Sequence, residues 1–283
     1  CPYFWPIGDK HILLHFSHSS GAKYLLGDYD KQRDKFVVTH SGAFTFGSVM
    51  PAATQAPSAT PDGKGGVIAI FNMNEGIPGN GQIMALPRRL TLRPESDLCG
   101  KFNPLHIEPA GNIESLRGEC TRVGPMKLPA NQEVVLETVR GNAMEIVAEI
   151  APQKEQTIEL NLLRSPGGEE LTRIQCFRDR GIRPYGVPRA GVVSIDTSHS
   201  SLGKNAVSRP PESATVELAP DEPLKLRIFI DRSVVEVFVN GRQCLAVRVY
   251  PGRADSVGVS LHSRGKDAVL TSLEAFQMKS IYE

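Results

Sequence analysis

The feature that most restricts the fold of this 283-residue chain is an alternation of apolar and polar residues with a period of two. Between Met144 and Ile150, apolar side chains at every second position alternate with Glu145 and Glu149, as a half-buried β-strand requires. The same period returns in three later segments: 224–230, 235–239 and 245–249. No long window has the i, i+3, i+4, i+7 apolar spacing of an amphipathic helix. The sequence therefore predicts an all-β fold.

Turn residues connect these predicted strands. Asn240-Gly241 follows the alternating segment 235–239 directly and is the strongest two-residue signal for a β-hairpin. The last apolar run, Val269 to Met278, is expected to close a sheet. Several successive antiparallel strands are the predicted result.

The first hundred residues have a different pattern. Short apolar runs are separated by turns rich in glycine and aspartate, which suits propeller blades as well as a sandwich. Between Glu108 and Gly118 the residues Pro109 and Gly111 interrupt a short polar stretch. We therefore expect two domains, residues 1–108 and 119–283, joined by a linker at 109–118.

Composition restricts the partners. Thirty-two basic and 31 acidic residues give a formal net charge of +1, which provides no long-range field to attract nucleic acid or an anionic membrane. The longest apolar runs are strand-sized, far short of the roughly 20 residues that span a bilayer. We expect a neutral partner, no nucleic acid and no membrane.

Cysteine and histidine give no metal signal. The five cysteines are scattered without a CxxC pair, which argues against a disulfide framework and a zinc cage and leaves the compartment open. His11 and His15 share one predicted strand face but have no third ligand at a recognisable spacing. We expect no metal and no cofactor.

Three segments, in order, resemble glycoside hydrolase family 32. The most specific is Ile230–Gly241 (IDRSVVEVFVNG), which is similar to the signature hairpin of that family's C-terminal sandwich. Upstream, Leu86–Leu92 resembles a strand of the last propeller blade, and Ile113–Arg117 resembles the passage from propeller to sandwich. Weaker matches to blade turns lie at 27–30, 56–58 and 62–63.

The resemblance implies a fold and a mechanism. The family's fold is a five-bladed β-propeller followed by a β-sandwich, so this chain is expected to contain part of the propeller and the whole sandwich. The family's active site is a funnel along the propeller axis, where a nucleophile and an acid lie about 5–5.5 Å apart and act with retention. Such enzymes hydrolyse β-fructosides and related furanosides.

The resemblance also implies that the catalytic carboxylates are not in these residues. The family draws its nucleophile from an Asn-Asp-Pro-Asn motif, a stabilising aspartate from Arg-Asp-Pro, and its acid from Glu-Cys-Pro. Cys1-Pro2 resembles the end of the last motif, so the general acid is expected just before Cys1 and both aspartates further upstream. Neither Asn-Asp-Pro nor Arg-Asp-Pro occurs in the sequence. We therefore predict no catalytic residue within the chain.

Four residues are predicted at the substrate pocket rim: Cys1, Trp5, Gln55 and Asn72. Alignment to the family places Gln55 where tyrosine is common and Asn72 where tryptophan often lines the sugar pocket. Both changes exchange an aromatic platform for an amide that only hydrogen-bonds. In the alternative interpretation, Trp5 is a core residue and Asn72 a turn amide.

These observations lead to two functions of different class. The first is a retaining β-fructosidase whose catalytic carboxylates lie upstream. The alternative is a non-catalytic carbohydrate-binding or scaffold protein with the same fold. An incomplete propeller leaves apolar blade faces uncovered, so we also expect either a separate N-terminal propeller fragment as partner or self-association through residues 1–108.

Overall fold

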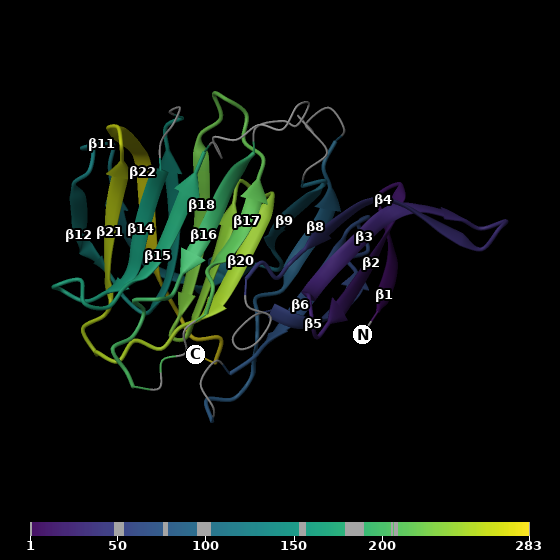
Figure 1. Cartoon of the computed structure of the whole chain (residues 1–283), viewed down its shortest axis with the longest axis horizontal. Helices are drawn as coiled ribbons and strands as arrows, with labels where there is room; N and C mark the ends of the chain where they lie inside the picture. Colours follow the sequence, from purple (N-terminus) through teal and green to yellow (C-terminus); the bar gives the residue numbers. More distant parts are fainter. Residues whose placement is uncertain are drawn as a thin grey trace.

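The computed structural model describes residues 2–47, 54–75, 79–94, 103–152, 157–178, 190–204, 206 and 209–282. Its strands form four sheets, and every pairing between named strands is antiparallel. Two large sheets lie face to face, and two small sheets lie beside them (Figure 1). The predicted all-β fold is confirmed.

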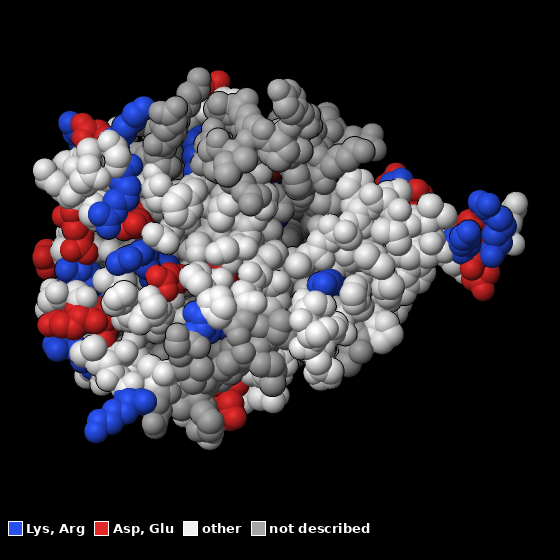
Figure 2. All heavy atoms as spheres, viewed as in Figure 1, with Lys and Arg blue, Asp and Glu red and all other residues white. Residues whose placement is uncertain are grey.

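The two small sheets come from the N-terminal part of the chain. The first has the order β1-β2-β3-β4, with strands β1 (Tyr3–Ile7), β2 (Lys10–Ser17), β3 (Gly21–Asp30) and β4 (Lys35–Ala43). The second has the order β5-β6-β8-β9, with β7 paired to β6, and its strands are β5 (Thr54–Pro61), β6 (Val67–Met73), β7 (Ile83–Met84), β8 (Arg88–Leu92) and β9 (Leu105–Pro109). The β3–β4 hairpin projects away from the molecule (Figure 1), and Figure 2 shows basic and acidic side chains gathered at its tip.

The two large sheets form a β-sandwich after the 3-10 helix η2 (Ile113–Leu116). One has the order β10-β22-β13-β18-β19-β20 with β11 paired to β22, and contains β10 (Arg117–Val123), β11 (Met126–Leu128), β13 (Ala143–Ile150), β18 (Leu224–Asp231), β19 (Val234–Val239), β20 (Gln243–Arg248) and β22 (Ala268–Met278). The other has the order β12-β21-β14-β15-β16-β17, and contains β12 (Glu133–Arg140), β14 (Thr157–Arg164), β15 (Thr172–Phe177), β16 (Gly191–Asp196), β17 (Glu212–Val216) and β21 (Gly258–Arg264).

The period-two pattern accounts for the sandwich core. The apolar positions of β13 and β18, such as Ile146 and Ile228, are fully buried in one cluster between the large sheets. The Asn240-Gly241 turn joins β19 to β20, and both residues have the positive φ that such hairpins require. The last predicted run is found in strand β22, which joins its sheet between β10 and β13.

One polar position of the alternation, Glu145, is also buried, whereas Glu149 on the same strand is partly exposed. Glu145 of β13 has no solvent exposure, because the guanidinium groups of Arg117 and Arg227 each hold its carboxylate at 2.6–2.8 Å. Ionic partners on neighbouring strands therefore replace water on that face.

A second apolar cluster joins the sandwich to the small sheets. It combines residues of both small sheets, such as Tyr24 and Phe71, with Phe229, Phe238 and Ala246 of the sandwich. Strand β19 thus contributes to two cores: Val235 and Val237 face the sandwich interior, while Val234 and Phe238 face the small sheets. The small sheets are consequently fixed against the sandwich by apolar packing.

Candidate functional site

Two of the predicted rim residues lie directly opposite each other. Gln55 of β5 and Asn72 of β6 are register partners, so their side chains lie on the same face of the second small sheet. A β-bulge follows Gln55, and Ala56 there has a positive φ of 33°. Asn72 donates from Nδ2 to Oε1 of Gln82 at 2.9 Å. Amides of this kind bind hydroxyl groups but do not transfer protons, so the pair suits recognition rather than acid-base chemistry.

Trp5 of β1 lies between the two small sheets. Its indole nitrogen donates to the carbonyl oxygen of Ala59 at 3.0 Å, and its ring packs against the second apolar cluster. This packing agrees with the core interpretation of Trp5, and its role at a pocket rim stays a prediction. Cys1, the remaining predicted rim residue, lies outside the described residues.

The sandwich holds the segment that follows Asn72, a contact that the sequence did not indicate. Nη1 of Arg248, at the end of β20, donates to the carbonyl oxygens of Asn74 and Gly81 at 3.3 and 3.2 Å. The hydroxyl of Tyr250 donates to the carbonyl oxygen of Glu75. Strand β20 therefore fixes both ends of the β6–β7 connection next to Asn72.

A fully buried ion pair connects β8 to β19. Nη2 of Arg88 lies 3.1 Å from Oε2 of Glu236, whose other oxygen accepts the amide of Leu86 at 2.6 Å. Burial raises the pKa of Glu236, and the nearby Arg88 guanidinium opposes that shift. The Arg88 guanidinium also lies 4.9 Å from the ring centre of Phe71. Because neither side chain is more than 1% exposed, this pair is a structural link and not a catalytic one.

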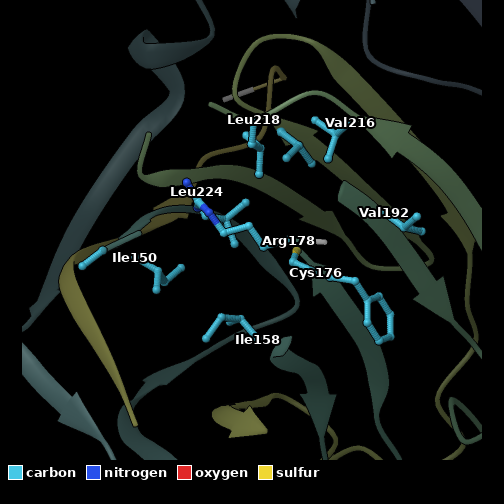
Figure 3. A pocket seen from close by; sticks show the side chains of 11 residues that line it. Ile150, Ile158, Cys176, Arg178, Val192, Val216, Leu218 and Leu224 are labelled. Atoms are coloured by element: carbon cyan, nitrogen blue, oxygen red, sulfur yellow. The ribbon is translucent and has the colours of Figure 1, made fainter. Parts of the chain in front are cut away.

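The sandwich interior contains a small apolar cavity that is not suited to catalysis. Figure 3 shows Cys176 among aliphatic side chains that line it, and the space of about 20 Å³ holds at most one water molecule. Burial raises the pKa of the Cys176 thiol to about 12, so the sulfur is protonated and unreactive at neutral pH.

Other site types find no support in the part of the chain that the structure describes. There, no group of three or more His, Cys, Asp or Glu side chains is arranged to hold a metal ion. Nor does any helix in these residues have the length and apolar character to cross a membrane.

Comparisons with known proteins agree with this architecture. Residues 112–277, more than half of the chain, match the family model described as the C-terminal part of glycosyl hydrolases family 32. The chain therefore belongs to glycosyl hydrolase family 32.

Individual relatives match different fractions of the chain. Raffinose invertase of Escherichia coli is 30% identical over 216 residues, which are 74% of this chain and 39% of that protein. Levanase of Bacillus subtilis is 27% identical over 62% of this chain and 24% of its own length. The chain thus spans well under two thirds of these relatives.

Solved structures share the fold. Fructan 1-exohydrolase IIa from Cichorium intybus superposes with a TM-score of 0.83 at 18% identity, covering 99% of this chain and 61% of that one. Sucrose-6-phosphate hydrolase from Lactobacillus gasseri gives a TM-score of 0.71 at the same identity. At such low identity the likeness concerns the fold alone.

Proposed function

We propose that this chain is the C-terminal part of a retaining glycosidase that acts on β-fructosides or related furanosides. The family match over residues 112–277 carries the proposal, and the invertase and levanase named above support the substrate class. The nucleophile, the stabilising aspartate and the general acid are then supplied by residues that precede Cys1.

The proposal includes the arrangement of domains. The two small antiparallel sheets are two blades of a five-bladed propeller, in residues 1–108, and residues 119–283 form the sandwich after a linker at 109–118. The change from small to large sheets between β9 and β10 supports this division. Within it, Cys1, Trp5, Gln55 and Asn72 line the rim of the propeller funnel, where the amide pair hydrogen-bonds to substrate hydroxyl groups.

Rejoining the chain to its natural upstream sequence tests the catalytic proposal. The complete protein is expected to release reducing sugar from sucrose, inulin or levan, with the rate reduced by Gln55→Ala and Asn72→Ala because each removes a rim amide. Val269→Thr, at an exposed position of β22 in the sandwich, is the control and leaves the rate unchanged. Absence of release from every furanoside tried at neutral pH contradicts the proposal.

The alternative function is a non-catalytic carbohydrate-binding or scaffold protein. The absence of Asn-Asp-Pro and Arg-Asp-Pro from the sequence, and the two amides in place of aromatic platforms, favour it. Calorimetry of the chain alone with fructans separates the two: a binding protein retains affinity that depends on Gln55 and Asn72, whereas half of a catalytic site does not.

We also propose that the free face of the first small sheet needs a cover. Phe4 on that face is 39% exposed and contacts the rings of His11, Tyr29 and Phe36, so aromatic side chains from all four strands meet there. A separate N-terminal propeller polypeptide or a second copy of the chain covers this surface. Size-exclusion chromatography and intact mass measurement check this, and a stable monomer without a bound polypeptide contradicts it.

A further inference from the structure

Two Asn-Gly dipeptides occur in the sequence, Asn80-Gly81 and Asn240-Gly241. In such a dipeptide the backbone nitrogen of glycine can attack the side-chain amide of the preceding asparagine, because glycine has no Cβ that obstructs the approach. The asparagine side chain must first turn toward that nitrogen, so the local structure decides whether the attack takes place. The two dipeptides of this chain lie in opposite surroundings.

Asn240 is held firmly in the hairpin between β19 and β20. Its Nδ2 donates to Oε1 of Glu222 and to the carbonyl oxygen of Pro223, both at 2.9 Å, and its Oδ1 accepts the amide of Lys225 at 2.9 Å. These three hydrogen bonds must break before the Asn240 side chain can rotate toward the nitrogen of Gly241.

Asn80 lies in the connection between β6 and β7 and is exposed. Among the described residues, its side chain makes one hydrogen bond, to the hydroxyl of Tyr250. Apart from its chain neighbours, nothing lies within 4 Å of a Cβ placed on Gly81, whereas a Cβ on Gly241 would lie 2.4 Å from Cε1 of His106. The space that the reaction needs is therefore open at Asn80 and closed in the hairpin.

The attacking atom is also free at the first dipeptide. The backbone nitrogen of Gly81 donates to no partner among the residues that the structure describes. The carbonyl oxygen of Gly81 accepts from Nη1 of Arg248 at 3.2 Å, which keeps the main chain in place. The nucleophile thus has a fixed position and no competing hydrogen bond.

From these observations we propose that Asn80 is a site of spontaneous deamidation and that Asn240 is protected from it. The nitrogen of Gly81 loses its proton to hydroxide and bonds to Cγ of Asn80, while Nδ2 takes a proton from water and leaves as ammonia. Water then opens the resulting five-membered succinimide. Cleavage between the nitrogen and Cγ gives aspartate, and cleavage between the nitrogen and the backbone carbonyl carbon gives isoaspartate.

The product changes the surroundings of the rim residue Asn72. A carboxylate in place of the side-chain amide does not donate to the Tyr250 hydroxyl. It also places a negative charge two residues before Gln82, whose Oε1 accepts the hydrogen bond from Asn72. Isoaspartate in addition lengthens the main chain next to Gly81, whose carbonyl oxygen is held by Arg248. Deamidation therefore loosens the β6–β7 connection beside the rim.

Prolonged incubation of the purified chain at pH 8, followed by peptide mapping with mass spectrometry, tests the proposal. In urea both dipeptides are unfolded, so Asn80 and Asn240 should react at similar rates and provide the reference. In the folded chain we expect Asn80 to react roughly tenfold faster than Asn240 or more, because Asn240 has two additional hydrogen bonds to break.

Variants test the assigned contacts. Tyr250→Phe should accelerate the reaction at Asn80 roughly threefold, the effect of one lost neutral hydrogen bond, and leave Asn240 unchanged. Gly81→Ala puts a methyl group beside the nucleophile and should slow the reaction at Asn80 alone. Tyr29→Phe, on the projecting β3–β4 hairpin, is the matched control and should change neither rate. Thermal unfolding of each variant confirms that it is folded.

Three results overturn the proposal. The first is equal protection of the two asparagines in the folded chain relative to urea, or faster reaction at Asn240. The second is no product at Asn80 in the time that the chain in urea reacts completely. The third is a rate at Asn80 that neither Tyr250→Phe nor Gly81→Ala changes. The proposed hydrolysis is unaffected by any of them, since sugar release by the complete protein measures it separately.

Discussion

At the scale of single residues, carboxylates inside this protein are held by arginines, amides and hydroxyls. Glu170, which is fully buried, accepts hydrogen bonds from the amides of Leu202, Gly252 and Arg253 and from the hydroxyl of Ser256. Burial opposes its charge, but these donors keep the pKa of Glu170 below its ordinary value. The two loops that supply the donors, between β16 and β17 and between β20 and β21, are thereby fixed to one side chain.

Glu133 makes this effect measurable as a function of pH. Arg164, helped by Ser260 and Asn161, lowers the pKa of Glu133 from 4.5 to about 2. Its contribution to stability is therefore complete above pH 4.5 and is lost as the pH falls toward 2. We expect the melting temperature of Glu133→Gln to fall less than that of the natural protein between pH 6 and pH 3.

The control for this prediction lies on the same strand. Glu137→Gln removes an exposed carboxylate of β12 that has no ionic partner among the described residues. Its melting curve should follow that of the natural protein at both pH values. Identical acid sensitivity of Glu133→Gln and the natural protein would show that the Arg164 contact contributes nothing.

At the scale of elements, the hairpin between β19 and β20 carries two separate constraints. Gly241 has a φ of 63°, and a Cβ there would lie 2.4 Å from Cε1 of His106. We expect Gly241→Ala to lower the free energy of unfolding by about 1–2 kcal/mol for the left-handed backbone, plus a further loss from displacing His106. Gly265 has a φ of 84°, and a Cβ there would meet nothing within 4 Å. Gly265→Ala should therefore lose only the backbone contribution to the free energy of unfolding. Equal losses in urea unfolding of the two variants would exclude the His106 contact.

The link between β8 and β19 is expected to be stronger. Arg88→Met leaves the buried carboxylate of Glu236 without its cation, which should cost about 3–5 kcal/mol in chemical denaturation. Adding Glu236→Gln should restore part of that loss. The neighbouring Arg89→Met, which breaks partly exposed pairs with Asp62 and Glu108, should cost less than about 1 kcal/mol. A similar cost for both arginines would contradict the structural role of the buried pair.

Strands and turns were accessible from the sequence, whereas contacts between distant strands were not. Period-two alternation and Asn240-Gly241 are local signals, so β13, β18, β19 and their hairpin were predicted correctly. The alternation predicts that Glu236 faces solvent. Its buried partner Arg88 is 148 positions away in the sequence, so the local pattern does not indicate the ion pair. The candidate site has the same limit, because the pairing of Gln55 with Asn72 depends on strand register.

At the scale of the whole molecule, the small sheets and the sandwich should unfold together. They share an apolar cluster, the Arg88–Glu236 pair and the hydrogen bonds from Arg248 to Asn74 and Gly81. We expect a single calorimetric transition whose van't Hoff and calorimetric enthalpies agree. Two resolved transitions would show that the shared cluster does not couple the two parts.

The burial of β19 on both faces limits how this protein can be recombined with its relatives. In a chimaera that exchanges the sandwich alone, the residues that replace Glu236 and Phe238 would pack against small sheets from a different parent protein. Segment 86–92 and strand β19 should therefore come from the same parent protein, although they lie far apart in the gene. Crossovers that move both together should yield folded hybrids more often than crossovers placed at the boundary between the sheets.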